Sequence, residues 1–129
     1  DSLVLFNDDV MQTSEQVGYR LCGQLLERHP DVTAVFCTND LVALGALRRL
    51  SEAGLRCPED VSVIGCDDIA LGEYFNPPIS TISFDKRRHG AEIAQWIIEK
   101  IADPKSHPYQ TMVVSTYAKL RKSIAPAKK

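Results

Sequence analysis

The sequence lacks several of the short motifs that indicate an enzyme. It has no G-x-G-x-x-G segment, which excludes the usual dinucleotide-binding turn, and no G-x-S-x-G segment, which excludes the nucleophile turn of many hydrolases. No apolar stretch is long enough to cross a membrane. Positive charge is not in excess, since 15 Lys and Arg residues stand against 17 Asp and Glu residues. This balance argues against direct nucleic-acid binding by the chain, which favours a strongly basic face.

Cysteine and histidine are few, and their spacing does not suit a metal site. None of the four cysteines forms a C-x-x-C pair, and no histidine cluster accompanies them. We therefore expect no metal and no cofactor, and we interpret the cysteines as buried free thiols in a reducing cytosol. These residues are Cys22, Cys37, Cys57 and Cys66.

The length of 129 residues is that of one domain, and 44% hydrophobic with 25% charged residues is typical of a globular protein. No signal peptide opens the chain. The first residue is Asp1 rather than Met, so we expect a piece or a processed product of a longer protein. Residues 125–129 are expected to form a disordered tail.

Apolar periodicity predicts strands that alternate with helices. The spacing from Thr13 to Gln16 is that of a capping box, and Gly54 is placed to end the second helix, whose inner side includes Leu44. Strands are predicted at 3–6, 32–37, 61–66, 79–84 and 112–117, and helices at 14–29, 40–53 and 85–101. The order predicts an α/β fold with an open three-layer αβα parallel sheet.

Polar residues follow two of the predicted strands at the point where each strand ends. Asn39 follows the strand at 32–37, and Asp67 follows the strand at 61–66. Ligands of open parallel sheets bind at the carboxyl ends of the strands. An amide that donates and accepts, beside a carboxylate that accepts, suits a sugar or another polyol. A structural interpretation also fits, with Asn39 as a helix cap and Asp67 as the start of a turn.

An acidic metal site is an alternative for the same sheet edge. Asp40, Asp67 and Asp68 are carboxylates of the kind that Mg²⁺ prefers. No phosphate-cradling glycine loop accompanies them, which disfavours phosphotransfer. The histidines lack a spaced nucleophile partner, so we expect no catalytic triad and no enzyme. They are His29, His89 and His107.

Three strings of the sequence together carry a family resemblance. N-D-L-V-A-L-G-A-L begins at Asn39, E-A-G-L-R-C-P-E-D-V-S-V-I-G-C-D-D-I begins at Glu52, and P-P-I-S-T-I begins at Pro77. They resemble the signature of the lactose-repressor/galactose-repressor (LacI/GalR) family of bacterial transcription regulators. The spacings N-D-x-x-A-x-G-A and P-x-D-V-S-V-x-G-x-D-D are together highly specific. The resemblance covers nearly all of the chain.

The resemblance implies a two-lobed, periplasmic-binding-protein-like core, of which this chain is the last part with a partial second lobe. Residues 1–124 are then the C-terminal part of an effector-binding and dimerisation domain, and the helix within 85–103 belongs to the other lobe. The implied protein is a cytoplasmic homodimer without a membrane partner. Its small-molecule effector, a carbohydrate or a derivative, shifts populations between states. Operator DNA is contacted only through an N-terminal domain that this chain does not contain.

The resemblance also implies roles for single residues. Asn39 and Asp67 match effector-contacting positions. Thr13 stands where the family often has an aromatic residue that stacks on the ligand, and Phe84 stands where it often has glutamine, so the ligand or its stacking surface is expected to differ.

A second set of positions matches the dimer interface of the family. These residues are Leu44, Arg48 and Phe75. A periplasmic sugar-binding protein of a transport system is the alternative function, and a carboxylate-based α/β enzyme is a more distant one. The strings N-D-L-V-A-L-G-A and P-E-D-V-S-V favour the regulator, and unpaired cysteines agree with it.

Overall fold

The computed structural model describes residues 3–8, 12, 14–105 and 111–126 of the chain. The chain divides into two compact units. Unit 1 comprises Asp1–Ser83 with Ala118–Lys129, and unit 2 comprises Phe84–Tyr117. Within the described ranges, no helix is both long enough and apolar enough to span a membrane.

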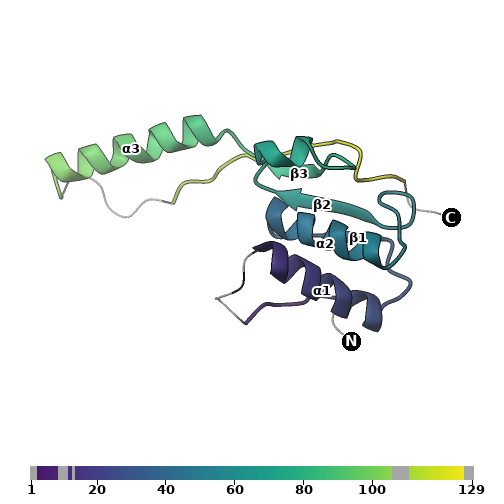
Figure 1. Cartoon of the computed structure of the whole chain (residues 1–129). Coiled ribbons are helices and arrows are strands. Elements are labelled where there is room, and N and C mark those ends of the chain that lie inside the picture. Colours follow the sequence, from purple (N-terminus) through teal and green to yellow (C-terminus); the bar gives the residue numbers. More distant parts are fainter. Residues whose placement is uncertain (1–2, 9–11, 13, 106–110, 127–129) are drawn as a thin grey trace. The chain divides into compact units, whose positions relative to one another are not determined.

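Unit 1 is built on a four-stranded sheet in the order β1-β2-β3-β4. Its strands are β1 (Ala34–Phe36), β2 (Ser62–Cys66), β3 (Ser80–Ser83) and β4 (Tyr117–Lys119). The strands β1 and β3 both pair in parallel with β2, which lies between them (Figure 1). Phe36 is opposite Ile64, and Cys66 is opposite Ile82. The three parallel strands therefore end at one edge of the sheet.

The segment after β4 runs antiparallel to β3. Lys122 N donates to Pro78 O at 3.1 Å, while Arg121 N donates to Ser80 Oγ at 2.8 Å. Ser123 is fully buried, and its hydroxyl donates to Val63 O at 2.6 Å and accepts from Ser80 N at 2.8 Å. The sheet is thus mixed, so the predicted open α/β fold is confirmed although the sheet is not wholly parallel.

Two helices of unit 1 pack side by side, and one of them covers the sheet. Helix α2 (Asp40–Glu52) packs on β2, and α1 (Ser14–Arg28) packs on α2 (Figure 1). The Asn39 side chain caps α2 by accepting from Val42 N at 2.8 Å. Gly54, just past the end of α2, has φ of +76°, a conformation that glycine adopts without a steric penalty. The predicted cap and the predicted stop of α2 are both confirmed.

The core of unit 1 lies where α2 meets the sheet. Leu44, which the apolar spacing placed on the inner side of α2, is only 5% exposed. Burial of such side chains is the main favourable contribution to folding, at roughly 1.5–3 kcal/mol for each large one. The other large core side chains are Leu47, Leu50, Val61, Val63 and Ile79.

Glycine allows α1 and α2 to approach each other closely. A Cβ atom on Gly45 would lie 2.0 Å from Glu15 O, and one on Gly18 would lie 2.0 Å from Val42 O. Neither position has room for a methyl group, because the nearest atoms belong to the backbone of the facing helix. The contact surface between the two helices therefore depends on glycine at both positions.

Unit 2 contains the long helix α3 (Lys86–Ala102). Asp85 caps it, since the carboxylate accepts from Arg88 N at 2.9 Å, and the helix predicted at 85–101 is confirmed. No residue of α3 is buried. Its exposed large apolar side chains are Ile93, Trp96, Ile97, Ile98 and Ile101.

Two predicted strands differ from the structure. Residues 3–6 are not part of the sheet, and Leu3, Val4 and Phe6 are exposed, so the predicted first strand is wrong. Of the predicted strand at 112–117, only Tyr117 belongs to β4. Apolar composition favours a strand but does not supply the ladder of hydrogen bonds that makes one. Thr13, predicted to cap the first helix, lies outside the described residues.

The close approach of α1 and α2 can be tested with Gly45→Ala. The added methyl group must displace α1, so we expect the free energy of unfolding to fall by about 1–3 kcal/mol. Urea denaturation followed by circular dichroism measures this change. Gly90→Ala in α3 is the control, because a Cβ atom there would meet no atom within 4 Å beyond the adjoining backbone of its own helix. An unchanged urea midpoint for Gly45→Ala would contradict the contact.

Candidate functional site

Asn39 and Asp67 follow the carboxyl ends of two neighbouring strands. Asn39 comes after β1 and Asp67 directly after β2, and both are half-buried. The Asn39 carbonyl oxygen is engaged by Val42 N at 2.8 Å, while its amide group remains a donor. The structural role as a cap is therefore confirmed, and it leaves the amide N–H groups for another partner.

The turn after β2 has an unusual backbone. Asp67 has φ of 98° and Asp68 has φ of 49°, both in the left-handed region that side chains other than glycine rarely adopt. Asp67 N donates to Ile82 O at 2.9 Å, and Asp68 N donates to Thr81 Oγ1 at 3.2 Å. Neighbouring β3 thus fixes the backbone that presents the Asp67 carboxylate. Strain of this kind is common at functional sites.

Asp68 is the centre of an ion-pair cluster. Arg121 Nη2 lies 2.6 Å from one carboxylate oxygen of Asp68, and Lys119 Nζ lies 3.1 Å from the other. Both cations also contact Glu73, at 2.8 and 3.1 Å respectively. The Arg121 side chain is only 10% exposed, and its Nη1 also donates to Ile79 O at 2.7 Å. The C-terminal segment is therefore tied to the turn that carries Asp67.

This cluster changes the acidity of both carboxyl groups. Burial would raise the pKa of the Asp68 carboxyl, but hydrogen bonds from Arg121 and Lys119 outweigh burial and hold the pKa below its usual value. Hydrogen bonds from the same two cations lower the pKa of Glu73. Both groups are therefore ionised at neutral pH, and Asp68 is engaged within the protein rather than offered to a ligand.

Asp40 is fully buried beneath the same turn. Its carboxylate accepts from Ile69 N at 2.9 Å and from the Thr81 hydroxyl at 2.7 Å. With Asp40 and Asp68 both committed to protein partners, the three aspartates do not form an open metal site. In the described part of the chain, no group of three or more His, Cys, Asp or Glu side chains is placed to hold a metal ion.

Three of the four thiols are poorly suited to chemistry at neutral pH. Burial raises the pKa of Cys22 to about 11 and that of Cys37 to about 12. Burial also raises the pKa of Cys57 to about 11. The reactive thiolate form is therefore scarce at these three positions. All four cysteines are free, as the sequence predicted, but only Cys22 and Cys37 are buried, whereas Cys57 and Cys66 are partly exposed.

The other two predicted ligand residues are Thr13 and Phe84. Thr13 lies outside the described residues. Phe84 begins unit 2 and packs edge-on against His89, with ring centroids 5.9 Å apart. Their roles stay predictions.

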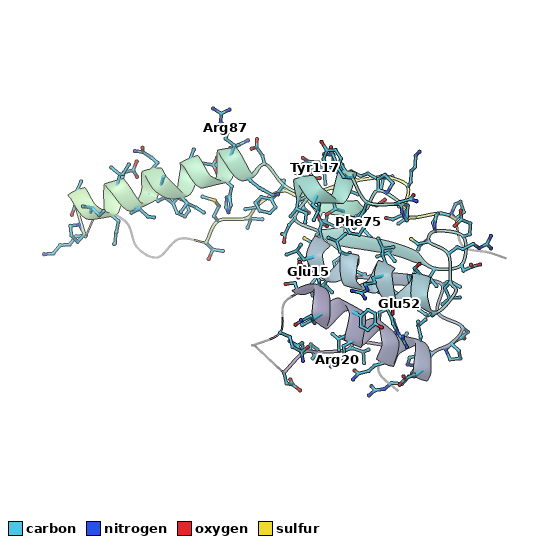
Figure 2. The ribbon with its side chains drawn as sticks, in the orientation of Figure 1. Glu15, Arg20, Glu52, Phe75, Arg87 and Tyr117 are labelled. Atoms are coloured by element: carbon cyan, nitrogen blue, oxygen red, sulfur yellow. The ribbon has the colours of Figure 1, made fainter. Side chains whose placement is uncertain are left out.

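The predicted dimer residues have different surroundings in unit 1. Leu44 is part of the core, and Phe75 packs against that core while half-buried. Arg48 is exposed and pairs with Glu52 at 3.0 Å, and Glu52 also accepts from Tyr19 at 2.5 Å. Figure 2 labels Glu52 and Phe75. Of the predicted interface residues, Arg48 has the most exposed side chain.

A cavity of about 590 Å³ lies elsewhere in unit 1, beside the edge strand β1. The segment Leu3–Asn7 lines one side of it, and α1 and β1 line the others. The lining is mainly apolar, with Phe6 and Phe36 among its most exposed members. Neither Asn39 nor Asp67 lines it.

Comparison with known proteins identifies the family. Residues 5–124 match the family described as the periplasmic binding protein-like domain. The chain belongs to this family, in the form found in LacI/GalR regulators. The predicted family and fold class are confirmed.

The relatives are transcription regulators. The HTH-type transcriptional repressor PurR of Vibrio atlanticus is 50% identical over 84 residues, which make up 65% of this chain and 25% of that protein. The structure of the regulator CelR with cellobiose has 36% identity and a TM-score of 0.79, and the match covers 84% of this chain and 33% of that one. A LacI family regulator from Enterococcus faecium with bound ribose has 35% identity and a TM-score of 0.79, with 91% and 42% covered.

The chain spans about a quarter of the length of the curated relatives it matches. The part of the family fold seen in unit 1 includes the sheet edge with Asn39 and Asp67.

Sequence reasoning missed the residues that hold the turn in place. Arg121 and Lys119 come from a segment that is 51 or more residues from Asp68. The sequence pattern indicates only that Thr81 is an ordinary strand residue. In the structure its hydroxyl contacts both Asp40 and the Asp68 amide. Asp40 stands next to Asn39 in the sequence, and the role considered for it was that of a metal ligand.

The ion-pair cluster predicts how stability depends on pH. The pKa values of Asp68 and Glu73 are lower in the folded protein than in the unfolded chain. The two carboxylates therefore stabilise the fold fully above their unfolded pKa values of about 4, and this stabilisation is lost as the pH falls through the folded pKa values. We expect the urea midpoint to decrease below about pH 5. Arg121→Met should lower the midpoint at pH 7 and reduce this acid dependence.

Arg56→Met is the matched control. Arg56 also pairs with an aspartate, Asp60, at 2.9 Å, but the arginine side chain is 69% exposed. Ion pairs between exposed side chains contribute little to the free energy of unfolding. Equal acid dependence of the urea midpoint in wild type and Arg121→Met would refute the role of the cluster.

Proposed function

We propose that the chain is part of the effector-sensing domain of a LacI/GalR-type transcription regulator. The observation that carries the proposal is the pair Asn39 and Asp67, which follow the carboxyl ends of β1 and β2 in a chain of this family. The matched relatives are repressors and regulators, which favours a regulator over a transport protein. A regulator that reaches operator DNA through another domain acts in the cytoplasm.

The proposed ligand is a carbohydrate or a close derivative. Two relatives are described with cellobiose and with ribose. Sugar hydroxyls need directional partners, and the Asn39 amide can donate while the Asp67 carboxylate can accept from two hydroxyls. Thr13 and Phe84 replace the usual aromatic and glutamine, so we expect the stacking surface to differ from that of the family.

The proposed mechanism is a shift between conformations and involves no covalent chemistry. A ligand changes the equilibrium only by binding one conformation better than the other. Contacts from unit 1 and from another lobe supply that difference. In this proposal α3 belongs to the other lobe, whose surface covers the apolar residues of α3, from Ile93 to Ile101. A homodimer would transmit the change to DNA-binding domains.

The ligand site can be tested with Asp67→Asn in the intact regulator. Asparagine tolerates the left-handed backbone of this position, so the change removes the charge and keeps the turn. We expect binding of the cognate sugar to weaken by about 10- to 100-fold, because a hydrogen bond to a charged group is lost. Calorimetric titration with D-ribose, cellobiose and lactose measures this loss.

The exposed Glu59→Gln on the turn before β2 is the control for loss of one negative charge. Its affinity should equal that of wild type. Unchanged affinity in Asp67→Asn would remove Asp67 from the site. Binding of Mg²⁺ without any carbohydrate would instead favour the carboxylate-enzyme alternative.

The dimer proposal can be tested at Arg48. Arg48→Glu places a carboxylate beside Glu52 on the exposed side of α2, so like charges would face each other across a symmetric interface. We expect dissociation at concentrations where wild type is dimeric, measured by analytical ultracentrifugation. Arg56→Glu is the matched charge reversal away from α2. A full dimer in Arg48→Glu would contradict the proposed interface.

A further inference from the structure

Asp40 is a buried carboxylate that the proposed ligand site does not use directly. It is the first residue of α2, directly after Asn39, and none of its surface is exposed. A carboxylate in this position cannot touch a ligand in the open edge of the sheet. Its buried charge requires partners, and both partners come from elements that frame the site.

The partners of Asp40 hold the turn that carries Asp67. One carboxylate oxygen accepts from Ile69 N at 2.9 Å, and the other accepts from the Thr81 hydroxyl at 2.7 Å. Thr81 is also fully buried, and its oxygen accepts from Asp68 N at 3.2 Å. Three elements therefore meet at the Asp40 carboxylate: the first turn of α2, the turn that follows β2, and the strand β3.

Three successive backbone amides of the turn are fixed in this way. Asp67 N is bonded to Ile82 O, Asp68 N to Thr81 Oγ1, and Ile69 N to Asp40 Oδ2. The same stretch contains the two left-handed residues, Asp67 and Asp68. A strained backbone persists only where its surroundings determine it from several sides. Asp40 supplies one of those bonds directly and supports a second through Thr81.

The sequence leaves room for this arrangement at Gly65. A Cβ atom on Gly65 would lie 2.2 Å from Asp40 Oδ1 and 3.1 Å from its Cα. Glycine two residues before Asp67 therefore lets α2 begin against β2. Any side chain at this position would push Asp40 away from Ile69 and Thr81.

We propose that Asp40 is a positioning residue that holds Asn39 and Asp67 as one rigid pair for the ligand. Asn39 is bonded to the start of α2 through Val42 N, and Asp67 is held through the amides at 68 and 69. The carboxylate of Asp40 joins the two supports. The ligand part of this inference rests on the proposed function, whereas the positioning of the turn does not.

The test compares Asp40→Ala with Ser123→Ala in the intact regulator. Ser123→Ala also removes two buried hydrogen bonds, one to β2 and one to β3. These bonds lie at the amino-terminal ends of the two strands, away from Asp67. Both variants should be less stable. Only Asp40→Ala should weaken binding of the cognate sugar, among D-ribose, cellobiose and lactose, by roughly tenfold or more. Only Asp40→Ala should accelerate hydrogen exchange of the amides at 67–69.

Asp40→Asn tests rescue. Its carbonyl can accept from Ile69 N while its amide donates to Thr81 Oγ1, so exchange and affinity should return close to wild type. If Asp40→Ala does not fold, Thr81→Val against Thr81→Ser provides the same comparison, because only serine keeps the hydroxyl.

Hydrogen exchange separates the two levels of the inference. If the wild type binds none of the three sugars, the proposed ligand class fails, but faster exchange at 67–69 in Asp40→Ala still supports positioning of the turn. Unchanged exchange there in Asp40→Ala overturns the positioning role. Equal losses of affinity in Asp40→Ala and Ser123→Ala at equal stability overturn the specific link to the ligand.

Discussion

The hydrogen bond from Cys37 N to Ile64 O, 2.8 Å long, and that from Ser62 N to Thr33 O, 2.9 Å long, pair β1 with β2 in the same direction. Two parallel strands must end at the same edge, and the helix between them must begin there. The positive end of the α2 dipole therefore also faces this edge, where it favours negative charge and acceptor groups. This one pairing therefore determines where three residues lie, namely Asn39, Asp67 and the buried Asp40.

The turn after β2 depends on parts of the chain that are distant in sequence. Arg121 and Lys119 bring two positive charges from the C-terminal segment to Asp68 and Glu73. Arg121 is mostly buried and bonded to Ile79 O, so its charge is fixed in direction as well as place. Two adjacent aspartates thus have different functions: Asp68 is neutralised internally, whereas no cation contacts Asp67 among the ion pairs found in the described residues.

Local signals in the sequence predicted most of unit 1, whereas the features that depend on long-range contacts were not predicted. Asn39 and Gly54 were predictable because a cap and a left-handed stop need particular residue types within one turn of the helix. The apolar spacing of α2 correctly placed Leu44 inside, and the family resemblance alone suggested an interface for it. The Leu3–Phe6 strand failed because pairing depends on a neighbour, and the Arg121–Asp68 pair has no local signal at all.

The buried thiols give the core a chemical reporter of its own. Cys22 on α1 and Cys37 after β1 are 3% and 4% exposed, and burial keeps them in the protonated form. Both residues line the cavity beside β1, and a thiol reagent can modify them only when local opening of unit 1 exposes them, because modification needs both solvent access and thiolate. The rate of alkylation at these two residues, followed apart from the less buried Cys57 and Cys66, therefore measures local opening of unit 1 around this cavity without any introduced label.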